Sequence, residues 1–164
     1  MQLFRLQETL KNEYLKQGLK ISCAESCTGG MLACALTELP GSSAIFDRGF
    51  ITYSNNAKIE LLGVSAKTLA EKGAVSEEVA REMALGALLR SDANVAVSVT
   101  GIAGPGGSEF KPEGCVHFSL AYKKGTCITH KMEFGAIGRK NVRLESCRFA
   151  LEWLHDAQKK FVTN

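Results

Sequence analysis

The sequence predicts an α/β protein: a single-domain, three-layer α/β/α sandwich over residues 1–164, with a mixed, mostly parallel sheet. Three observations predict it. Helical and strand-like patterns alternate as far as residue 101, as in proteins that cover a sheet with helices on both faces. The run "NVAVSVTG" (94–101) has so little polarity that it indicates a strand buried on both faces. A hairpin pattern and a long closing helix follow, which makes the sheet mixed.

The N-terminal part alternates helix and strand twice. Residues 3–17 place apolar side chains at helical spacing, and Gly18 can end that helix. "LKISCAE" alternates apolar and small residues, which predicts a short strand. "TGGMLACALTELPG" predicts a helix that stops at Pro40-Gly41. "SAIFDRGFITYS" is rich in β-formers and is expected to contain the second strand.

Three helical patterns come before the central strand. "NNAKIELLGV" opens with two possible caps, Asn55 and Asn56, and predicts a short helix. "SAKTLAEKG" can form another. "SEEVAREMALGALLRS" is the clearest of the three, because Ser76 can cap it and two glutamates stand in its first turn.

The C-terminal part begins after the strand at 94–101 with a loop rich in glycine and proline, "GIAGPGGSEFKPEG". "CVHFSLAYKKGTCITHKMEF" then predicts a hairpin that turns near Lys124-Gly125. A long helix from about residue 139 to 161 closes the sandwich.

Composition argues against several classes of function. The net charge is +3 and no run of four basic residues occurs, which argues against nucleic acid but suits a small anionic ligand. No signal-peptide pattern and no bilayer-spanning apolar run occur, so we expect a cytoplasmic protein without a membrane partner. No C-x-x-C pair occurs, so we expect no metal site. Five of the six cysteines lie in apolar or alternating patterns and are expected to be buried: Cys23, Cys34, Cys115, Cys127 and Cys147.

The stretch "AESCTGG" (24–30) joins a strand to a helix, where ligands of open α/β sheets gather. Free N–H groups of the helix start could form an oxyanion hole, and Gly29 and Gly30 would let a substrate approach closely. Ser26 and Cys27 could each be the nucleophile, and no histidine lies within eighty residues to act as its base. The simpler alternative is that Ser26 or Thr28 only caps the helix.

A lysine could take the place of the missing histidine. Lys58 lies in the first turn of a predicted helix, and Tyr53 ends the strand before it. Burial and the positive end of the helix dipole would both lower the pKa of Lys58, which a lysine base requires. Tyr53 could hydrogen-bond the lysine or relay a proton. The alternative is an exposed lysine and a tyrosine at the edge of the core.

Two further stretches are expected at the same edge of the sheet. "VTGIAGPGG" (99–107) would bring the hydroxyl of Thr100 and the amides of Gly101 and Gly104, unless it is a plain tight turn. "GRKNVR" (138–143) puts three cations at the start of a helix, where they oppose its dipole. They are either solvated or hold an anion, and a phosphate would suit both the arginines and the helix terminus.

Together these stretches resemble the nicotinamide-nucleotide amidase family, also known as the C-terminal domain of the competence/damage-inducible protein CinA. The resemblance covers about residues 5 to 155 and rests on "AESCTGG", "GFITYSNNAKIELLGV", "GAVSEEVAREMALGAL", "AVSVTGIAGPGG" and "GRKNVR", in the right order. It implies a hydrolase that removes the amide of nicotinamide mononucleotide, giving nicotinate mononucleotide and ammonia in pyridine nucleotide recycling. It also implies a Ser-Lys mechanism that needs no metal or cofactor.

The resemblance implies that Ser26 is the nucleophile, Lys58 the base, and Tyr53 an orienting or relaying group. The backbone amides near residues 28–30 and the "TGIAG" loop would hold the oxyanion. The alternative function is a non-catalytic module of the same family that binds a pyridine nucleotide or phosphate. Because relatives commonly form dimers, we expect a homodimer. The expected substrate-binding residues are Thr28, Gly29, Gly30, Thr100, Gly101 and Arg139.

Overall fold

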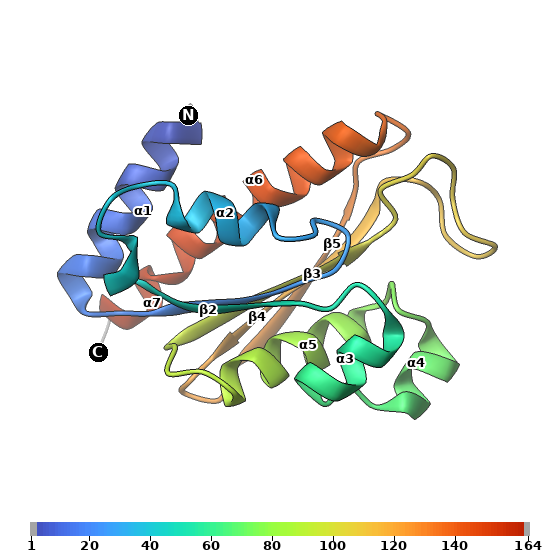
Figure 1. Cartoon of the computed structure of the whole chain (residues 1–164), viewed down its shortest axis with the longest axis horizontal. Coiled ribbons are helices and arrows are strands. Elements are labelled where there is room, and N and C mark those ends of the chain that lie inside the picture. Colours follow the sequence, from blue (N-terminus) through green and yellow to red (C-terminus); the bar gives the residue numbers. More distant parts are fainter. Residues whose placement is uncertain (1–2, 163–164) are drawn as a thin grey trace.

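The computed structural model describes residues 3–162, in which a five-stranded sheet carries helices on both faces (Figure 1). The strand order is β2-β1-β3-β4-β5, and only β4 runs opposite to the other four. The strands are β1 (Ile21–Glu25), β2 (Phe46–Ile51), β3 (Val95–Gly101), β4 (Cys115–Tyr122) and β5 (Cys127–Glu133). The helices are α1 (Leu3–Gln17), α2 (Met31–Thr37), α3 (Asn55–Leu62), α4 (Ala66–Lys72), α5 (Glu77–Leu89), α6 (Arg139–Ala157) and α7 (Lys159–Val162), with a 3-10 turn at Ser42–Ala44.

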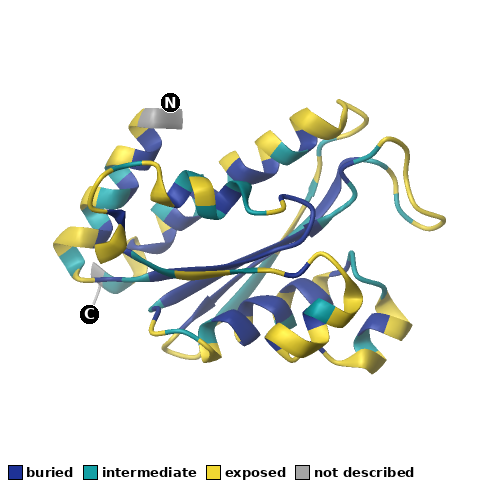
Figure 2. Cartoon of the chain, in the orientation of Figure 1, coloured by how far each residue is buried: buried dark blue, intermediate teal, exposed yellow. Residues whose placement is uncertain are grey.

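The helices form two layers around the sheet. Helices α1, α2 and α6 cover one face, and α3, α4 and α5 cover the other (Figure 1). The larger core lies under the first group and includes Leu6 and Leu151, whereas the smaller core lies under the second and includes Leu62 and Met83. Figure 2 shows the inner strands buried and the outward helix faces exposed. The predicted three-layer α/β/α fold with a mixed sheet is therefore confirmed.

Strand β1 sends alternate side chains to the two layers, as any strand does. Ile21 and Cys23 belong to the core under α1, α2 and α6, whereas Ala24 belongs to the core under α3 and α5. The same alternation continues past the core residues, so Glu25 projects toward α2 and Ser26 toward α3. Two adjacent polar residues thus leave the sheet in opposite directions.

The ends of three parallel strands bring three distant loops together. Glu25 pairs with Ile51 of β2 and with Val99 of β3, so the chain leaves all three strands at one level. The backbone extends this pairing by one step, because the Ser26 N–H donates to the Val99 carbonyl at 2.9 Å and the Thr52 N–H donates to the Glu25 carbonyl at 2.8 Å. The predicted meeting point at the carboxyl edge of the sheet is observed.

The last predicted helix is divided in two. A helix over residues 139–161 was expected from the sequence, but α6 ends at Ala157 and α7 begins at Lys159. Gln158 lies between them, nearly buried, and its side-chain oxygen accepts a hydrogen bond from the Gln17 amide of α1. Among the helices of residues 3–162, none is both long and apolar enough to cross a membrane.

Three smaller predictions are also wrong. Ser54 caps α3, with its hydroxyl accepting from the Ala57 N–H at 3.1 Å, so Asn55 and Asn56 are helical residues rather than caps. Cys34 is exposed rather than buried, because it lies on the outward face of the short helix α2. Cys127 is only half-buried, since it begins the edge strand β5.

Candidate active site

Ser26 and Lys58 form a buried pair at the carboxyl edge of the sheet. The Lys58 ammonium nitrogen Nζ lies 3.0 Å from Ser26 Oγ, although the two residues are 32 apart in the chain. Ser26 keeps 9% of its surface exposed and Lys58 only 1%. The serine can therefore meet a substrate from solvent while the amine stays behind it.

Local structure fixes the position of the Lys58 amine. The Ser54 cap starts α3 three residues after the end of β2, which turns the fourth helical residue, Lys58, back toward the sheet. Nζ then donates to the backbone carbonyls of Thr52 at 2.8 Å and of Tyr53 at 3.4 Å. Burial lowers the pKa of Lys58, because a charged amine loses its hydration there. A lowered pKa is what a serine's base needs in order to be neutral.

Cys27 is next to Ser26 but lies in the opposite environment. Its side chain packs in the core under α1, α2 and α6, and burial raises the pKa of its thiol to about 12. Because the thiolate is the reactive form of cysteine, this thiol is a weak nucleophile at neutral pH. The geometry and the protonation states therefore favour Ser26 over Cys27.

The Tyr53 hydroxyl contacts Arg139 rather than the lysine amine. Tyr53 is 61% exposed, and its hydroxyl accepts a hydrogen bond from Arg139 Nη2 at 2.9 Å. Arg139 Nη1 donates to the carbonyl of Gly104 at 2.9 Å. One guanidinium thus connects the loop after β2, the loop after β3 and the start of α6.

The two residues expected at the end of β3 behave differently. The Thr100 side chain is buried, and its hydroxyl donates to the Ala74 carbonyl at 2.8 Å. Gly101 is half-exposed. The Val99 carbonyl points toward β1, and backbone groups two residues apart on a strand point to the same side, so the backbone N–H and carbonyl of Gly101 also face β1. A Cβ at Gly101 would lie 2.6 Å from Val116 Cγ2, so only glycine fits this end of the strand.

The expected oxyanion amides after Ser26 already have partners in the protein. The Gly29 N–H donates to the Ser26 carbonyl at 3.1 Å, and the Gly30 N–H donates to the Glu25 carboxylate at 3.0 Å. Both glycines have positive φ, 58° and 99°, which a residue with a side chain rarely adopts. Thr28 is fully buried, and its hydroxyl has no hydrogen-bond partner in the part of the chain that the structure describes.

From sequence, Glu25 had no assigned role, and Arg143 was grouped only with the cations that could hold an anion. The buried carboxylate of Glu25 accepts hydrogen bonds from the first amides of α2, and Arg143 donates to two carbonyls of the loop after Ser26. The alternation of Ile21, Cys23 and Glu25 could have placed the glutamate on the α2 side. The spacing of Arg139 and Arg143, four residues apart, could have placed both arginines on one face of α6.

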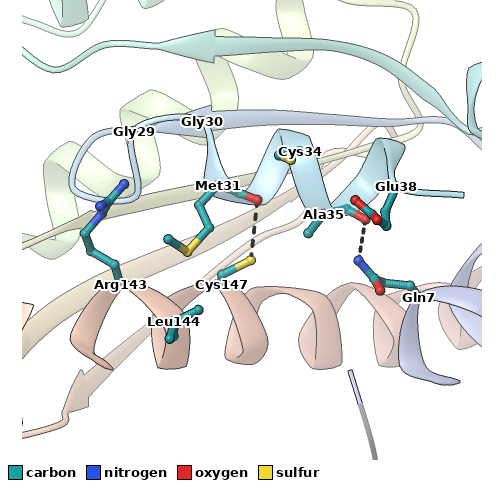
Figure 3. A pocket seen from close by; sticks show the side chains of 10 residues that line it. All are labelled: Gln7, Gly29, Gly30, Met31, Cys34, Ala35, Glu38, Arg143, Leu144 and Cys147. Carbon is teal, nitrogen blue, oxygen red and sulfur yellow. Dashed lines mark hydrogen bonds between the residues drawn. The ribbon is translucent and has the colours of Figure 1, made fainter. Parts of the chain in front are cut away.

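A cavity of about 710 Å³ lies on the other side of this loop (Figure 3). Its walls come from α1, α2 and α6, and the Arg143 side chain points from α6 toward the loop at Gly29. In residues 3–162, no group of three or more His, Cys, Asp or Glu side chains is arranged to hold a metal ion. The lining residues are Gln7, Gly29, Gly30, Met31, Cys34, Ala35, Glu38, Arg143, Leu144 and Cys147.

Comparisons with known proteins show similarity to one family over most of the chain. The family described as "CinA C-terminal domain" matches residues 3–158. A protein of Enterobacter agglomerans named "Nicotinamide-nucleotide amidohydrolase PncC" is 54% identical over 149 residues, which are 90% of this chain and 88% of the relative. The protein of the same name from Escherichia coli K12 is 47% identical over 154 residues, 93% of each chain.

A solved structure has the same fold. The crystal structure of the competence/damage inducible protein CihA from Agrobacterium tumefaciens matches with a TM-score of 0.92 and 51% identity. The match covers 96% of this chain and 95% of that one.

Proposed function

The chain belongs to the CinA C-terminal domain family, and on that premise we propose that it is a single-domain nicotinamide-nucleotide amidohydrolase. The substrate is nicotinamide mononucleotide, and the products are nicotinate mononucleotide and ammonia. The observation that carries the proposal is the buried 3.0 Å contact between Lys58 Nζ and Ser26 Oγ. This contact pairs a hydroxyl with an amine whose pKa burial has lowered.

The first half of the reaction transfers the acyl group to Ser26. Lys58 in its neutral form accepts the hydroxyl proton while Ser26 Oγ attacks the carboxamide carbon. The tetrahedral intermediate collapses as the C–N bond breaks, and Lys58 returns the proton to the leaving nitrogen. Ammonia departs and an ester between the nicotinoyl group and Ser26 remains.

The second half hydrolyses that ester. Lys58 accepts a proton from a water molecule, the resulting hydroxide attacks the ester carbon, and the bond to Ser26 Oγ breaks. Lys58 then returns the proton to Ser26, and the carboxylic acid product releases its remaining proton to solvent and leaves as a carboxylate. The Thr52 and Tyr53 carbonyls that hold Nζ keep the amine next to Ser26 through both halves.

We assign the oxyanion to the end of β3 rather than to the start of α2. The Gly101 N–H points toward β1, one step beyond the Ser26–Val99 hydrogen bond. The amides of Gly29 and Gly30 are already donated. In this proposal, Gly29 and Gly30 allow the backbone turn of the loop, and the buried Thr28 packs beneath that turn and supports it.

The substrate phosphate is assigned to Arg139. A guanidinium has five N–H donors, and the contacts to Tyr53 and Gly104 use two of them. The remaining donors suit a phosphate, which arginine binds with strong charge-assisted hydrogen bonds. The Tyr53 hydroxyl, held by the same guanidinium, would orient the bound nucleotide.

The test is ammonia release from nicotinamide mononucleotide by the wild type and by Ser26→Ala. Loss of a covalent nucleophile lowers kcat by about 10⁴-fold or more. The matched control is Ser43→Ala, which removes an exposed hydroxyl and should leave kcat unchanged. A wild type that binds the mononucleotide in a calorimeter but releases no ammonia would support the non-catalytic binding module instead. An active Ser26→Ala variant would remove Ser26 from the mechanism.

A further inference from the structure

We propose that Glu25 and Arg143 are positioning residues that hold the nucleophile loop, residues 26–30, from its two sides. This inference rests on the proposed function, because it assigns Ser26 as the nucleophile. Neither side chain reaches the reacting atoms. Each binds the backbone of the loop or of the helix that follows it.

Glu25 holds the end of the loop that leads into α2. Its side chain is fully buried, and its carboxylate accepts the backbone N–H groups of Gly30 at 3.0 Å, Leu32 at 3.1 Å and Ala33 at 2.8 Å. A buried carboxylate needs several donors, and the positive end of a helix dipole stabilises it further. Since Glu25 directly precedes Ser26, it fixes the distance between the nucleophile and the start of α2.

Arg143 holds the middle of the loop. Its Nε donates to the Cys27 carbonyl at 3.2 Å, and its Nη2 donates to the Thr28 carbonyl at 3.0 Å. Both peptide bonds that carry these carbonyls are trans, so their N–H groups point away from α6. One of these is the Gly29 N–H, which turns back to the Ser26 carbonyl and closes the loop.

The two side chains act on opposite kinds of backbone group. The Glu25 carboxylate accepts hydrogen bonds from N–H groups, and the Arg143 guanidinium donates hydrogen bonds to carbonyls. The loop is therefore fixed in one conformation, although within residues 3–162 Glu25 and Arg143 form no direct ion pair. The 3.0 Å contact to Lys58 depends on that conformation, because Lys58 is itself held by two carbonyls of another loop. A displacement of Ser26 of about 1 Å can lower the rate by about 100-fold.

The same contacts separate Arg143 from Arg139. Arg139 is exposed at the start of α6 and keeps donors available for an anion. Arg143, one turn later, is half-buried and directs two donors at loop carbonyls. Loss of Arg143 should therefore act on the chemical step, whereas loss of Arg139 should act on recognition of the phosphate.

The main test compares Arg143→Ala with wild type on nicotinamide mononucleotide and on nicotinamide riboside. We expect kcat to fall by about 10- to 100-fold on both substrates, since both need the same loop. Guanidinium added at millimolar concentration should restore part of kcat in Arg143→Ala, and Arg143→Lys should restore little because lysine cannot span two carbonyls. The matched control is Arg148→Ala, which removes an exposed guanidinium from the same helix. A rise in KM for the mononucleotide alone would overturn the proposal and make Arg143 a phosphate ligand.

Glu25→Gln tests the other side of the loop. Glutamine keeps one acceptor oxygen but places an NH₂ group against backbone donors, so we expect kcat to fall by about 10-fold or more. Glu25→Asp, which keeps the charge on a shorter side chain, should retain more activity. If Glu25→Gln fails to fold, the Arg143 variants still decide the proposal. A folded Glu25→Gln protein with wild-type kcat would overturn the role of Glu25.

A reaction at Ser26 that needs no amide substrate separates this inference from the proposed function. A fluorophosphonate forms a bond from Ser26 Oγ to phosphorus and expels fluoride while Lys58 takes the proton. We expect Arg143→Ala to slow this labelling by the same factor as kcat. Labelling without ammonia release in the wild type would refute only the assigned substrate. Equal labelling rates in Arg143→Ala and wild type would overturn the positioning role, and an unlabelled wild type would overturn the Ser26 nucleophile together with it.

Discussion

Replacing Lys58 with methionine removes the proposed base while keeping a side chain of similar size. The two side chains have similar length, and Lys58 is 1% exposed, so the methionine would fill the same buried space. Three oxygens would lose their donor: Ser26 Oγ, the Thr52 carbonyl and the Tyr53 carbonyl. The first loss bears on catalysis and the other two bear on stability.

The size of each effect follows from these contacts. Loss of a positioned general base lowers kcat by about 10²- to 10⁴-fold. The Thr52 carbonyl is buried, and leaving it without a donor costs about 1–3 kcal/mol. For a chain of this size each kcal/mol lowers Tm by about 2–4 °C, so Tm should fall by about 2–12 °C. Lys58→Met should therefore stay folded at 25 °C while losing nearly all of its activity.

The pH dependence gives an independent signature. Burial lowers the pKa of Lys58, so the wild-type kcat should rise with pH along a limb that lies below the ordinary lysine value of 10.5. Between the lowered pKa and 10.5, the unfolded chain binds more protons at this residue than the folded protein does. The free energy of unfolding of the wild type should therefore increase with pH across that window. Lys58→Met should lack both the activity limb and this contribution to stability.

Ammonia release measured from pH 6 to 10, together with urea unfolding at the same pH values, gives both quantities. Lys67→Met is the matched control, because Lys67 is exposed on α4, where it pairs with Glu71 at 3.8 Å. That control should keep the wild-type kcat, Tm and pH profile. A Lys58→Met protein that retains more than about a tenth of the wild-type kcat would contradict lysine as the base, since the base should contribute at least 10²-fold.

Three further outcomes are expected. Cys27→Ala should keep kcat within a few-fold of wild type, because the Cys27 thiol has a pKa of about 12; a steady-state assay that finds it inactive would restore cysteine as a candidate nucleophile. Arg139→Ala should lower kcat/KM for nicotinamide mononucleotide by about 10- to 100-fold but hardly change it for nicotinamide riboside; an unchanged ratio would remove Arg139 from phosphate recognition. Gly30→Ala should lose about 1–3 kcal/mol in urea unfolding, because its φ is 99° and the new Cβ would lie 3.0 Å from Ile51 Cδ1; an equally stable variant would show that the turn tolerates a side chain.

The sequence predicted the fold well because each layer has a local signal. The alternation of apolar residues in β1 and the apolar run of β3 both specify strands, and Ser76 caps α5 as expected. The errors lie where tertiary contacts override local preference. The break after α6 at Gln158 coincides with a side-chain contact to α1, which no periodicity could reveal.

The candidate site was predictable in its members but not in its contacts. The stretches around Ser26 and Lys58 indicated a nucleophile and a base from residue type and from their expected places at helix starts. The hydrogen bond between the Tyr53 hydroxyl and Arg139 depends on where α6 begins relative to two loops. The residue pattern of a single segment does not show how distant segments lie relative to one another. The internal partners of the Gly29 and Gly30 amides depend on Glu25 and on the turn itself, so their expected availability to substrate could not be judged from sequence.

The alternation along β1 divides the site into two parts with separable effects. Glu25 points into the layer of α2 and α6, where Arg143 also contacts the loop. Ser26 points into the layer of α3, where Lys58 Nζ lies 3.0 Å from Ser26 Oγ. Substitutions in the layer of α2 and α6 alter the position of Ser26 but leave the surroundings of the Lys58 amine intact. Changes in the second layer alter the protonation of the amine. Arg143→Ala should therefore lower kcat at every pH without moving the limb, whereas a substitution that hydrates Lys58 should move the limb toward higher pH.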